Sequence, residues 1–340
     1  MKALIAMSGG VDSSAAALLI KEKGYDAMGA IMHLLGERNK DADAAKDVCD
    51  KIGIPFYEFD FSEEFSSCVI KSFVESYESG ATPNPCIECN RHLKFGKFVD
   101  AAKELGCTNI ATGHYAKIER CGNDFLLKKA KDVSKDQSYV LYSIKREMLS
   151  EILLPLGEYT KEEIREIAAS NGFINAHKKD SQDICFVPDG NYKKVISSLS
   201  NKTYPEGDFV NLKGEVLGKH KGIIGYTIGQ RKGLGLALPA PMYVCEKKVE
   251  KNEVVLCSNE ELFTRDMKVK NVNWLASDKI PDKIKARVKI RYKHEEQPAE
   301  INFTEDGAFV KFDDPQRAIS KGQAAVFYDG DTVLGGGTID

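Results

Sequence analysis

The sequence predicts an α/β fold in which a doubly wound parallel sheet is followed by two small β-rich domains, the last of them a β-barrel. In the first half of the chain, apolar strand-like runs alternate with helical patterns. After about residue 204, short β-rich runs are separated by Gly, Asp and Pro. At 340 residues the chain also exceeds the size of a comfortable single core. We therefore expect one domain over residues 1–200, a central β-rich domain over 204–264 and a β-barrel over 266–340.

The expected strands of the first domain are the apolar runs KALIAM, AMGAIM, FYEFDF and NIATGH, with helical patterns between them. A further helix is expected after Thr160, because Thr160 and Glu163 match a capping box and the periodic stretch EEIREIAASNG follows. Gly172 is the expected stop of that helix. The segment 81–90, ATPNPCIECN, should be irregular because its two prolines disfavour both helix and sheet.

Composition limits the classes of protein to consider. No apolar run approaches the roughly 20 residues of a membrane helix, and the first strand lacks the layout of a signal peptide, so we expect a cytoplasmic protein. The formal net charge of −3 shows no basic surplus, so contact with a nucleic acid must depend on local basic clusters. Nine cysteines without a secretory signal favour metal or redox chemistry over a disulfide framework.

A glycine turn, residues 8–13 with the sequence SGGVDS, directly follows the first strand and leads into an Ala-rich helix closed by Gly24. A helix N-terminus at such a turn presents free N–H groups and the positive end of the helix dipole, which predicts phosphate binding. The loop lacks the lysine of a Walker A motif, so it is not built for ordinary kinase or ATPase chemistry. The alternative is a structural turn in which Asp12 and Ser13 only cap the helix.

SGGVDS resembles the pyrophosphate-binding loop of the PP-loop ATPases, which cut ATP between the α and β phosphates and adenylate a substrate oxygen. Further motifs resemble the tRNA-specific 2-thiouridylases, the MnmA/TrmU family, over nearly the whole chain. These are TPNPCIECN, ATGHYA, KDQSYVLY, KKDSQDICF, YTIGQRKGLG, IRYKH and GQAAVFYDGDTVLGGG. The resemblance implies an enzyme that uses ATP and Mg²⁺ to adenylate the 2-carbonyl oxygen of the wobble uridine. Sulfur then replaces that oxygen at C2, and AMP and pyrophosphate are released.

The resemblance also implies three groups of binding residues, each of which has a plainer alternative. Met32 is equally well an ordinary core residue, whereas a glycine at position 113 permits close approach of a ligand to the backbone. The tRNA-contacting residues have suitable chemistry, although each would otherwise be read as a solvated surface residue. The residues implied for ATP are Ala6, Met7, Ser8, Gly9, Gly10, Val11, Asp12, Ser13, Met32 and Gly113. Those implied for the target base are Asn84, Pro85 and Cys86, and those for tRNA are His114, Lys135, Asp136, Gln137, Arg291, Tyr292 and Gln323.

Two cysteines are the expected catalytic residues. The basic stretch Arg91, His92 and Lys94 begins a helix just after Cys89 and should lower the pKa of that thiol. By the resemblance, Cys185 carries the incoming sulfur as a persulfide. Cys89 then releases the sulfur by closing a disulfide with Cys185, or holds it at the site. A sulfur donor protein or sulfide is the implied partner besides tRNA.

Cys86 departs from the best-known form of the family, which has an aspartate proposed as acid or base at this position. The change creates a Cys86-x-x-Cys89 pair. Together with Cys185, the pair could hold a [4Fe–4S] cluster with one iron open to sulfide. The alternatives are a resolving thiol in a persulfide relay and an inert substitution. A zinc site is weaker, because a closed structural site needs four ligands.

Two rival functions also remain open. Another PP-loop enzyme, such as an amidotransferase-like ligase, would share the nucleotide loop but would not need Cys89 or Cys185. A non-catalytic metal or RNA binder would use SGGVDS only as a turn.

Overall fold

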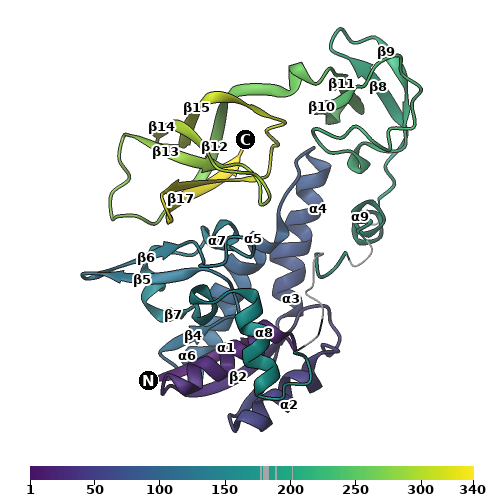
Figure 1. Ribbon diagram of the computed structural model, residues 1–340. Helices are drawn as coiled ribbons and strands as arrows, with labels where there is room; N and C mark the ends of the chain where they lie inside the picture. The colour runs from purple at the N-terminus through teal and green to yellow at the C-terminus, as the bar shows by residue number, and fades with distance from the viewer. Residues whose placement is uncertain (177, 179–183, 188–189, 201) are drawn as a thin grey trace.

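The computed structural model describes residues 1–340 except 177, 179–183, 188–189 and 201. A five-stranded parallel sheet with the order β3-β2-β1-β4-β7 forms the centre of the N-terminal domain (Figure 1). Its strands are β1 (Lys2–Met7), β2 (Asp26–His33), β3 (Phe56–Asp60), β4 (Asn109–Ala111) and β7 (Ile152–Leu153).

Both faces of this sheet are buried, because successive side chains of β1 enter different cores. Leu4 packs in a core that also contains α6 (Phe98–Glu104) and α4 (Lys71–Glu78). Ile5 packs on the other side, in a core with α1 (Val11–Glu22) and α2 (Ala42–Ile52). Such two-sided cover is what a parallel sheet requires. The predicted parallel sheet wound with helices is confirmed.

The remaining elements of the N-terminal domain are short, apart from the capped helix α8. The Thr160 side chain accepts from the Glu163 amide and the Glu163 side chain binds the Thr160 amide, so the predicted capping box is confirmed. The helices are α3 (Ser62–Glu64), η1 (Phe65–Ile70), α5 (Pro85–Cys89), η2 (Asn90–Lys97), α7 (Ser138–Leu141), η3 (Arg146–Glu151), η4 (Pro155–Glu158), α8 (Lys161–Ser170) and α9 (Tyr192–Ser200). The strands β5 (Lys117–Cys121) and β6 (Asp124–Lys128) form a hairpin.

The segment expected to be irregular contains a helix, and this prediction was wrong from residue 85 onward. Helix α5 begins at Pro85, and its N-cap Asn84 accepts a hydrogen bond from the Cys86 amide at 3.1 Å. Proline is tolerated in the first helical turn because the N–H it lacks has no intrahelical partner there. The two reactive-cysteine candidates Cys86 and Cys89 therefore share one helical turn.

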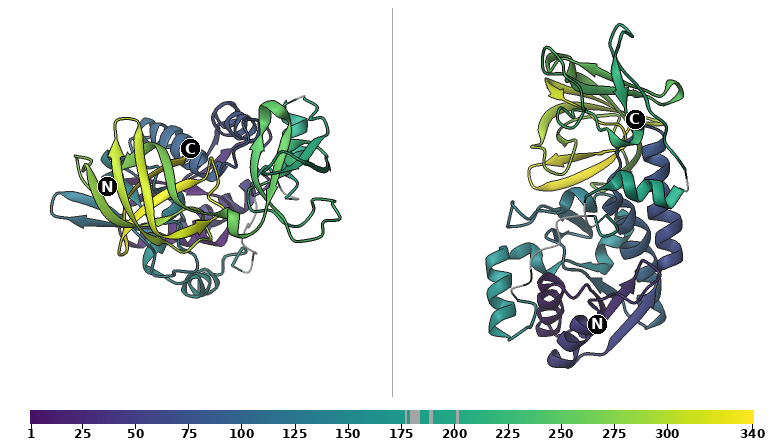
Figure 2. Two further views of the ribbon diagram at one scale, coloured as in Figure 1. Left: turned by 90° about the horizontal axis from the view of Figure 1, so that it is seen from above. Right: turned by 90° about the vertical axis from the view of Figure 1, so that its right-hand side faces the viewer.

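The rest of the chain forms two β structures that lie side by side over the N-terminal domain (Figure 2). The central sheet has the order β10-β11-β8-β9, and the last six strands close into a barrel through the pairing of β12 with β17, as predicted. The central elements are β8 (Gly207–Asn211), β9 (Val216–His220), η5 (Ile223–Gly225), β10 (Tyr243–Lys248), η6 (Val249–Lys251), β11 (Glu253–Cys257) and η7 (Glu260–Leu262). The barrel strands are β12 (Phe263–Trp274), β13 (Lys283–Lys289), β14 (Gln297–Thr304), β15 (Gly307–Arg317), β16 (Ala324–Asp329) and β17 (Thr332–Ile339).

The hairpin β5–β6 extends the barrel sheet through the pairing of Lys128 with Thr332. The N-terminal domain and the barrel are therefore joined by backbone pairing as well as by side chains. Within the described part of the chain, no helix is both long and apolar enough to cross a membrane.

Candidate active site

A cavity of about 680 Å³ lies at the carboxyl ends of β1, β2 and β4. This is the edge where parallel α/β sheets bind ligands. Nine of the ten residues predicted for ATP line the cavity, and the tenth, Gly9, is buried and does not line it. The lining residues are Ala6, Met7, Ser8, Gly10, Val11, Asp12, Ser13, Met32, Asp41, Lys94, Thr112, Gly113, His114, Tyr115, Ser134, Lys135, Gln137, Lys161, Lys178, Cys185, Tyr292 and Lys293.

The SGGVDS loop is held in shape by its own hydroxyls and by one distant amide. The Ser13 hydroxyl donates to the Gly10 carbonyl at 3.1 Å and accepts from the Ser8 amide at 3.1 Å. The Asn175 side chain donates to the Gly9 carbonyl at 3.1 Å. Gly10 is the N-cap of α1 and makes no side-chain capping hydrogen bond. The first turn of α1 thus lines the cavity without a capping side chain, which is the arrangement an anion site requires.

Gly9 permits the tight turn of the loop. Its φ is +65°, a conformation that favours glycine, and a Cβ there would lie 2.6 Å from the Cβ of Asp41. Gly113 also permits a close approach, although the neighbour is the loop itself. A Cβ on Gly113 would lie 3.0 Å from the Asp12 carbonyl carbon and the Ser13 amide nitrogen.

Asp12 lies at the centre of a polar cluster that the sequence did not reveal. Its carboxylate accepts from Lys161 Nζ at 2.7 and 2.8 Å and from the Tyr115 hydroxyl at 2.8 Å. The Lys161 side chain is 6% exposed, whereas that of Asp12 is 31% exposed. Lys161 is the first residue of α8 and carried no recognisable motif. The structure therefore places a buried cation against the nucleotide loop.

The three candidate thiols lie near one another at this end of the cavity. Desolvation, and then the nearby thiols of Cys89 and Cys86, raises the pKa of Cys185 to about 11. Cys185 lines the cavity and is exposed, as is Cys86, whereas Cys89 is partly buried. All three are free thiols.

The expected activation of Cys89 by its basic neighbours was wrong. Lys94 does lower the pKa of this thiol, but burial raises it by more, and Cys86 raises it as well. The net shift is therefore upward. A charged neighbour in the sequence could not reveal this, because the burial comes from tertiary packing.

The described residues do not fit an iron–sulfur cluster. Among them, no three Cys, His, Asp or Glu side chains are arranged to hold a metal ion. Cys86, Cys89 and Cys185 are all within the described part of the chain, so their placement does not make a ligand set.

The residues predicted for tRNA divide into two groups. Lys135, Gln137 and Tyr292 line the cavity, as does the buried His114. Burial, and then Lys94, holds the pKa of His114 well below its usual range, so this imidazole is neutral. It contacts the Thr112 hydroxyl at 2.8 Å.

The second group consists of Asp136, Arg291 and Gln323, which do not line the cavity. The buried Asp136 accepts from the Ala130 amide at 3.0 Å and from the Ser138 hydroxyl at 2.7 Å. Arg291 donates to a backbone carbonyl of the barrel, that of Arg317, at 2.9 Å. Gln323 reaches across to the N-terminal domain and donates to the Thr82 carbonyl at 2.7 Å.

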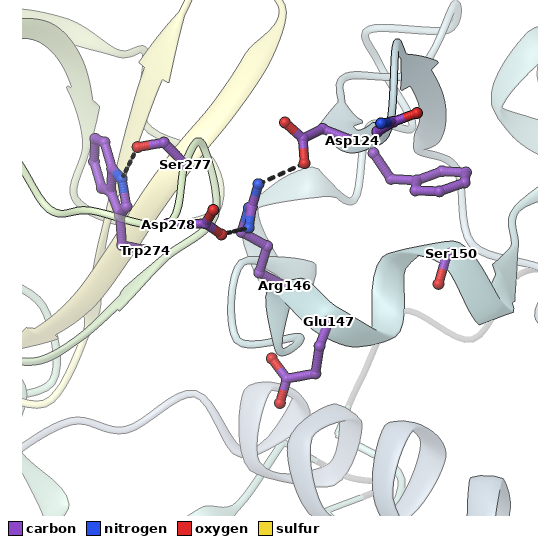
Figure 3. Close-up of a pocket in the computed structure, with 9 residues that line it drawn as sticks. Asp124, Arg146, Glu147, Ser150, Trp274, Ser277 and Asp278 are labelled. Atoms are coloured by element: carbon purple, nitrogen blue, oxygen red, sulfur yellow. Dashed lines mark hydrogen bonds and ion pairs between the residues drawn. The ribbon is translucent and has the colours of Figure 1, made fainter.

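A second, shallower pocket of about 440 Å³ lies between the β5–β6 hairpin and the barrel (Figure 3). Arg146 crosses it and pairs with Asp124 of the hairpin at 2.7 Å and with Asp278 of the barrel. Trp274, the only tryptophan of the chain, lies on the barrel side and binds Ser277. Two carboxylates already neutralise Arg146. We therefore interpret this pocket as a contact between domains and not as a nucleotide site.

Three family models together match nearly the whole chain. The family model described as tRNA methyl transferase HUP domain matches residues 1–189. The tRNA methyl transferase PRC-barrel domain matches residues 193–258, and the Aminomethyltransferase beta-barrel domain matches residues 264–339.

Curated relatives that match almost from end to end are named tRNA-specific 2-thiouridylases. The tRNA-specific 2-thiouridylase MnmA of Clostridioides difficile is 46% identical over 353 residues, which cover 100% of this chain and 98% of the relative. The enzyme named MnmA 1 of Clostridium tetani is 48% identical over 349 residues, with 100% and 96% coverage. The enzyme of Treponema denticola is 44% identical over 358 residues, with 100% and 98% coverage. With the SGGVDS loop and Cys185 at one cavity and such identity over the full length, the chain belongs to the family of tRNA-specific 2-thiouridylases.

Proposed function

We propose that this protein makes 2-thiouridine in tRNA by adenylating the 2-carbonyl oxygen of the wobble uridine and then replacing that oxygen with sulfur. The observation that carries the proposal is that the SGGVDS loop and Cys185 line the same cavity. A base carbonyl is a poor electrophile until its oxygen carries a good leaving group. Activation by ATP and delivery of sulfur must therefore occur at one place.

ATP would bind with its pyrophosphate portion at the uncapped N-terminus of α1 and its adenine toward Met32 and Gly113. The loop lacks a Walker lysine, and Lys161 supplies the cation that the phosphates need. Asp12 is the natural oxygen ligand for an Mg²⁺ ion that arrives with the phosphates, because Mg²⁺ binds through a few carboxylates and substrate phosphates. ATP binding would thus exchange the Asp12–Lys161 ion pair for contacts to Mg²⁺ and phosphate.

Sulfur transfer would use two thiols. The thiolate of Cys185, which is exposed to an approaching donor, attacks the outer sulfur of a cysteine persulfide on a donor protein, and the donor thiolate leaves, so that Cys185 carries the persulfide. The terminal sulfur attacks C2 of the adenylated uridine, and AMP leaves with the electron pair of the C–O bond. The Cys89 thiolate then attacks the Cys185 sulfur and forms a disulfide. The electrons of the broken S–S bond stay with the new thiocarbonyl, and a thiol reductant restores both cysteines.

In this scheme Cys86 is an accessory thiol beside the relay. The thiols as placed do not form a cluster ligand set, so no step of the proposal depends on iron. The uridine would lie at Asn84, Pro85 and Cys86, next to Cys89 on the same helical turn. Lys135, Gln137 and Tyr292 are best placed to contact the anticodon region, because they line the mouth of the cavity. We also propose that the three domains comprise residues 1–200, 204–264 and 266–340, and that the protein is cytoplasmic.

Replacing single cysteines by serine tests the proposal. The products to measure are 2-thiouridine in tRNA by mass spectrometry and pyrophosphate released in the presence of unmodified tRNA. Cys89→Ser and Cys185→Ser should abolish thiouridine while tRNA-dependent pyrophosphate release continues. Cys121→Ser, at an exposed thiol on β5, is the matched control and should leave both products unchanged. Full thiouridine formation by both catalytic variants would overturn the proposal and favour a ligase.

Measuring the iron and acid-labile sulfide content of protein purified without oxygen distinguishes the persulfide relay from the iron–sulfur cluster. The relay predicts iron-free protein that still thiolates tRNA with a persulfide donor. About four irons per chain, lost in Cys86→Ser, would replace the relay with a cluster-dependent route.

A further inference from the structure

The three domains meet at a short segment just before the reactive-cysteine helix. Helix α4 ends at Glu78 and points toward the two β domains (Figure 1), and α5 begins at Pro85. Residues 80–82 lie between them. Both C-terminal domains contact these residues, and neither the motifs nor the proposed chemistry accounts for these contacts.

The barrel binds both backbone polar groups of Thr82, its amide N–H and its carbonyl oxygen. The Thr82 amide donates to the Lys321 carbonyl at 2.8 Å, and the Thr82 carbonyl accepts from the Gln323 side chain at 2.7 Å. The turn between them is tightly fitted. Gly322 has φ +87°, and a Cβ there would lie 2.8 Å from the Cβ of Ala81. The last barrel strand holds this turn, since the Gly322 amide donates to the Ile339 carbonyl at 2.9 Å.

The central domain contacts the same segment from its own side. Lys247 Nζ lies 3.5 Å from the Ala81 carbonyl and 5.7 Å from the centre of the Tyr77 ring. A Cβ on Gly80 would lie 3.1 Å from Val249 Cγ2. Glu78, at the end of α4, accepts from the Tyr204 hydroxyl at 2.7 Å. Residues 78–82 are thus held by all three parts of the molecule.

This segment is mechanically coupled to the reactive thiols. Only Pro83, Asn84 and Pro85 separate Thr82 from Cys86. The two prolines have fixed φ angles and restrict the residues before them, so the connection is stiff. Asn84 caps α5 through the Cys86 amide. A displacement of the Thr82 peptide must therefore move the turn of helix that carries Cys86 and Cys89.

We propose that Gln323 is a positioning residue, which holds the Thr82 carbonyl and so sets the place of the reactive-cysteine helix according to the seating of the barrel. The family resemblance implied only a tRNA contact for this residue. The Gln323 side chain uses one N–H on Thr82, and its other polar groups can still meet RNA. The buried Thr82 hydroxyl has no hydrogen-bond partner in the described part of the chain, so the barrel holds Thr82 through its backbone amide and carbonyl, and Gln323 supplies the only side-chain donor among these described contacts. The inference rests on the proposed function, in which Cys89 takes part in sulfur transfer.

Gln323→Met tests the proposal, because methionine keeps the side-chain length and removes the donor. The matched control is Gln316→Met. Gln316 is also buried in the barrel and donates to a backbone carbonyl at 2.7 Å, but that carbonyl, of Asp314, belongs to the barrel itself. The measurement is the rate at which iodoacetamide labels individual cysteines in the full-length protein without ATP or tRNA, followed by peptide mass spectrometry.

Loss of one neutral hydrogen bond should release the segment and speed labelling of the partly buried Cys89 by about fivefold, while the exposed Cys86 and Cys121 are unchanged. Gln316→Met should leave all three rates unchanged. Gly322→Ala disturbs the same contact from the other side and should reproduce the pattern. The kcat of thiolation should fall at saturating tRNA in Gln323→Met, since positioning is not restored by binding.

Unchanged labelling in both Gln323→Met and Gly322→Ala would overturn the proposal, as would equal acceleration at Cys121. A raised KM for tRNA with normal labelling and kcat would also overturn it and leave Gln323 as a simple tRNA contact. Labelling requires no turnover, so this result stands apart from the cysteine-to-serine test. Thiouridine formation by Cys89→Ser would refute the proposed relay without altering the labelling rates.

Discussion

Replacing Lys161 by methionine should separate binding of the phosphates of ATP from binding of its adenosine. Lys161 Nζ lies 2.7 and 2.8 Å from the two carboxylate oxygens of Asp12, and both residues line the cavity with the nucleotide loop. Methionine fills nearly the same volume without charge. The change leaves the Asp12 carboxylate facing the incoming phosphates without its lysine partner, while the Tyr115 hydroxyl still donates to it.

The size of the effect follows from the distances and the exposure. The Lys161 ammonium and a phosphate charge about 4 Å from it would attract each other by about 4 kcal/mol at an effective dielectric constant of about 20. The Asp12 side chain is 31% exposed, so solvent screening reduces this to about half. A loss of about 2 kcal/mol corresponds to roughly a 30-fold weaker affinity. We therefore expect the Kd for ATP to rise about 30-fold in Lys161→Met.

Titration calorimetry with ATP, AMP and adenosine checks this prediction. Affinity for adenosine should be unchanged, because the ribose and base do not meet Lys161. Lys131→Met is the matched control, since Lys131 pairs with Glu163 near the same helix at 2.8 Å but lies on the exposed surface. Its affinity for ATP should equal that of the unaltered protein. A folded Lys161→Met protein that binds ATP normally would refute the reasoning.

Three further predictions address the loop, a thiol and a helix cap. Gly9→Ala should destabilise the protein by about 2 kcal/mol more than Gly24→Ala in urea unfolding, because both have positive φ but only Gly9 meets a neighbour; equal losses would contradict a clash. Alkylation of Cys185 should speed up about tenfold per pH unit from pH 7 toward its pKa of about 11, because only the thiolate reacts. A plateau that begins near pH 9 would show an unshifted thiol. Thr160→Ala should lower the unfolding free energy by about 1 kcal/mol through loss of the capping box, and an unchanged urea midpoint would contradict it.

Local sequence patterns correctly predicted several helices and strands of the N-terminal domain. The apolar runs predicted β1, β2, β3 and β4, and the motif at residues 160–163 predicted the start of α8. The strand β7, Ile152–Leu153, was not predicted, because two residues are too few to show a periodic pattern. Helix α5 escaped because two prolines suggested an irregular loop, although a proline at the first helical position is compatible with a helix.

The parts of the site that were missed depend on residues far apart in the sequence. The Asp12–Lys161 pair joins positions 149 residues apart, and the Gln323–Thr82 bond spans 241. No local pattern encodes either contact. The direction in which the pKa of Cys89 shifts also depends on packing, since burial outweighs the nearby positive charge. The nucleotide loop was predictable because strand, turn and helix N-terminus are consecutive.

The raised pKa values of the thiols favour the relay as a way of timing the chemistry. With the pKa of Cys185 near 11, its thiol is protonated at neutral pH and is a weak nucleophile on its own. A persulfide is more acidic than the thiol that carries it, so loading with sulfur creates the reactive anion. Cys89 is protonated in the same way, which delays its attack until the persulfide sulfur has bonded to C2 and made Cys185 a better electrophile. In the proposed relay, low reactivity of the empty enzyme would follow from the desolvation that raises the pKa of both thiols.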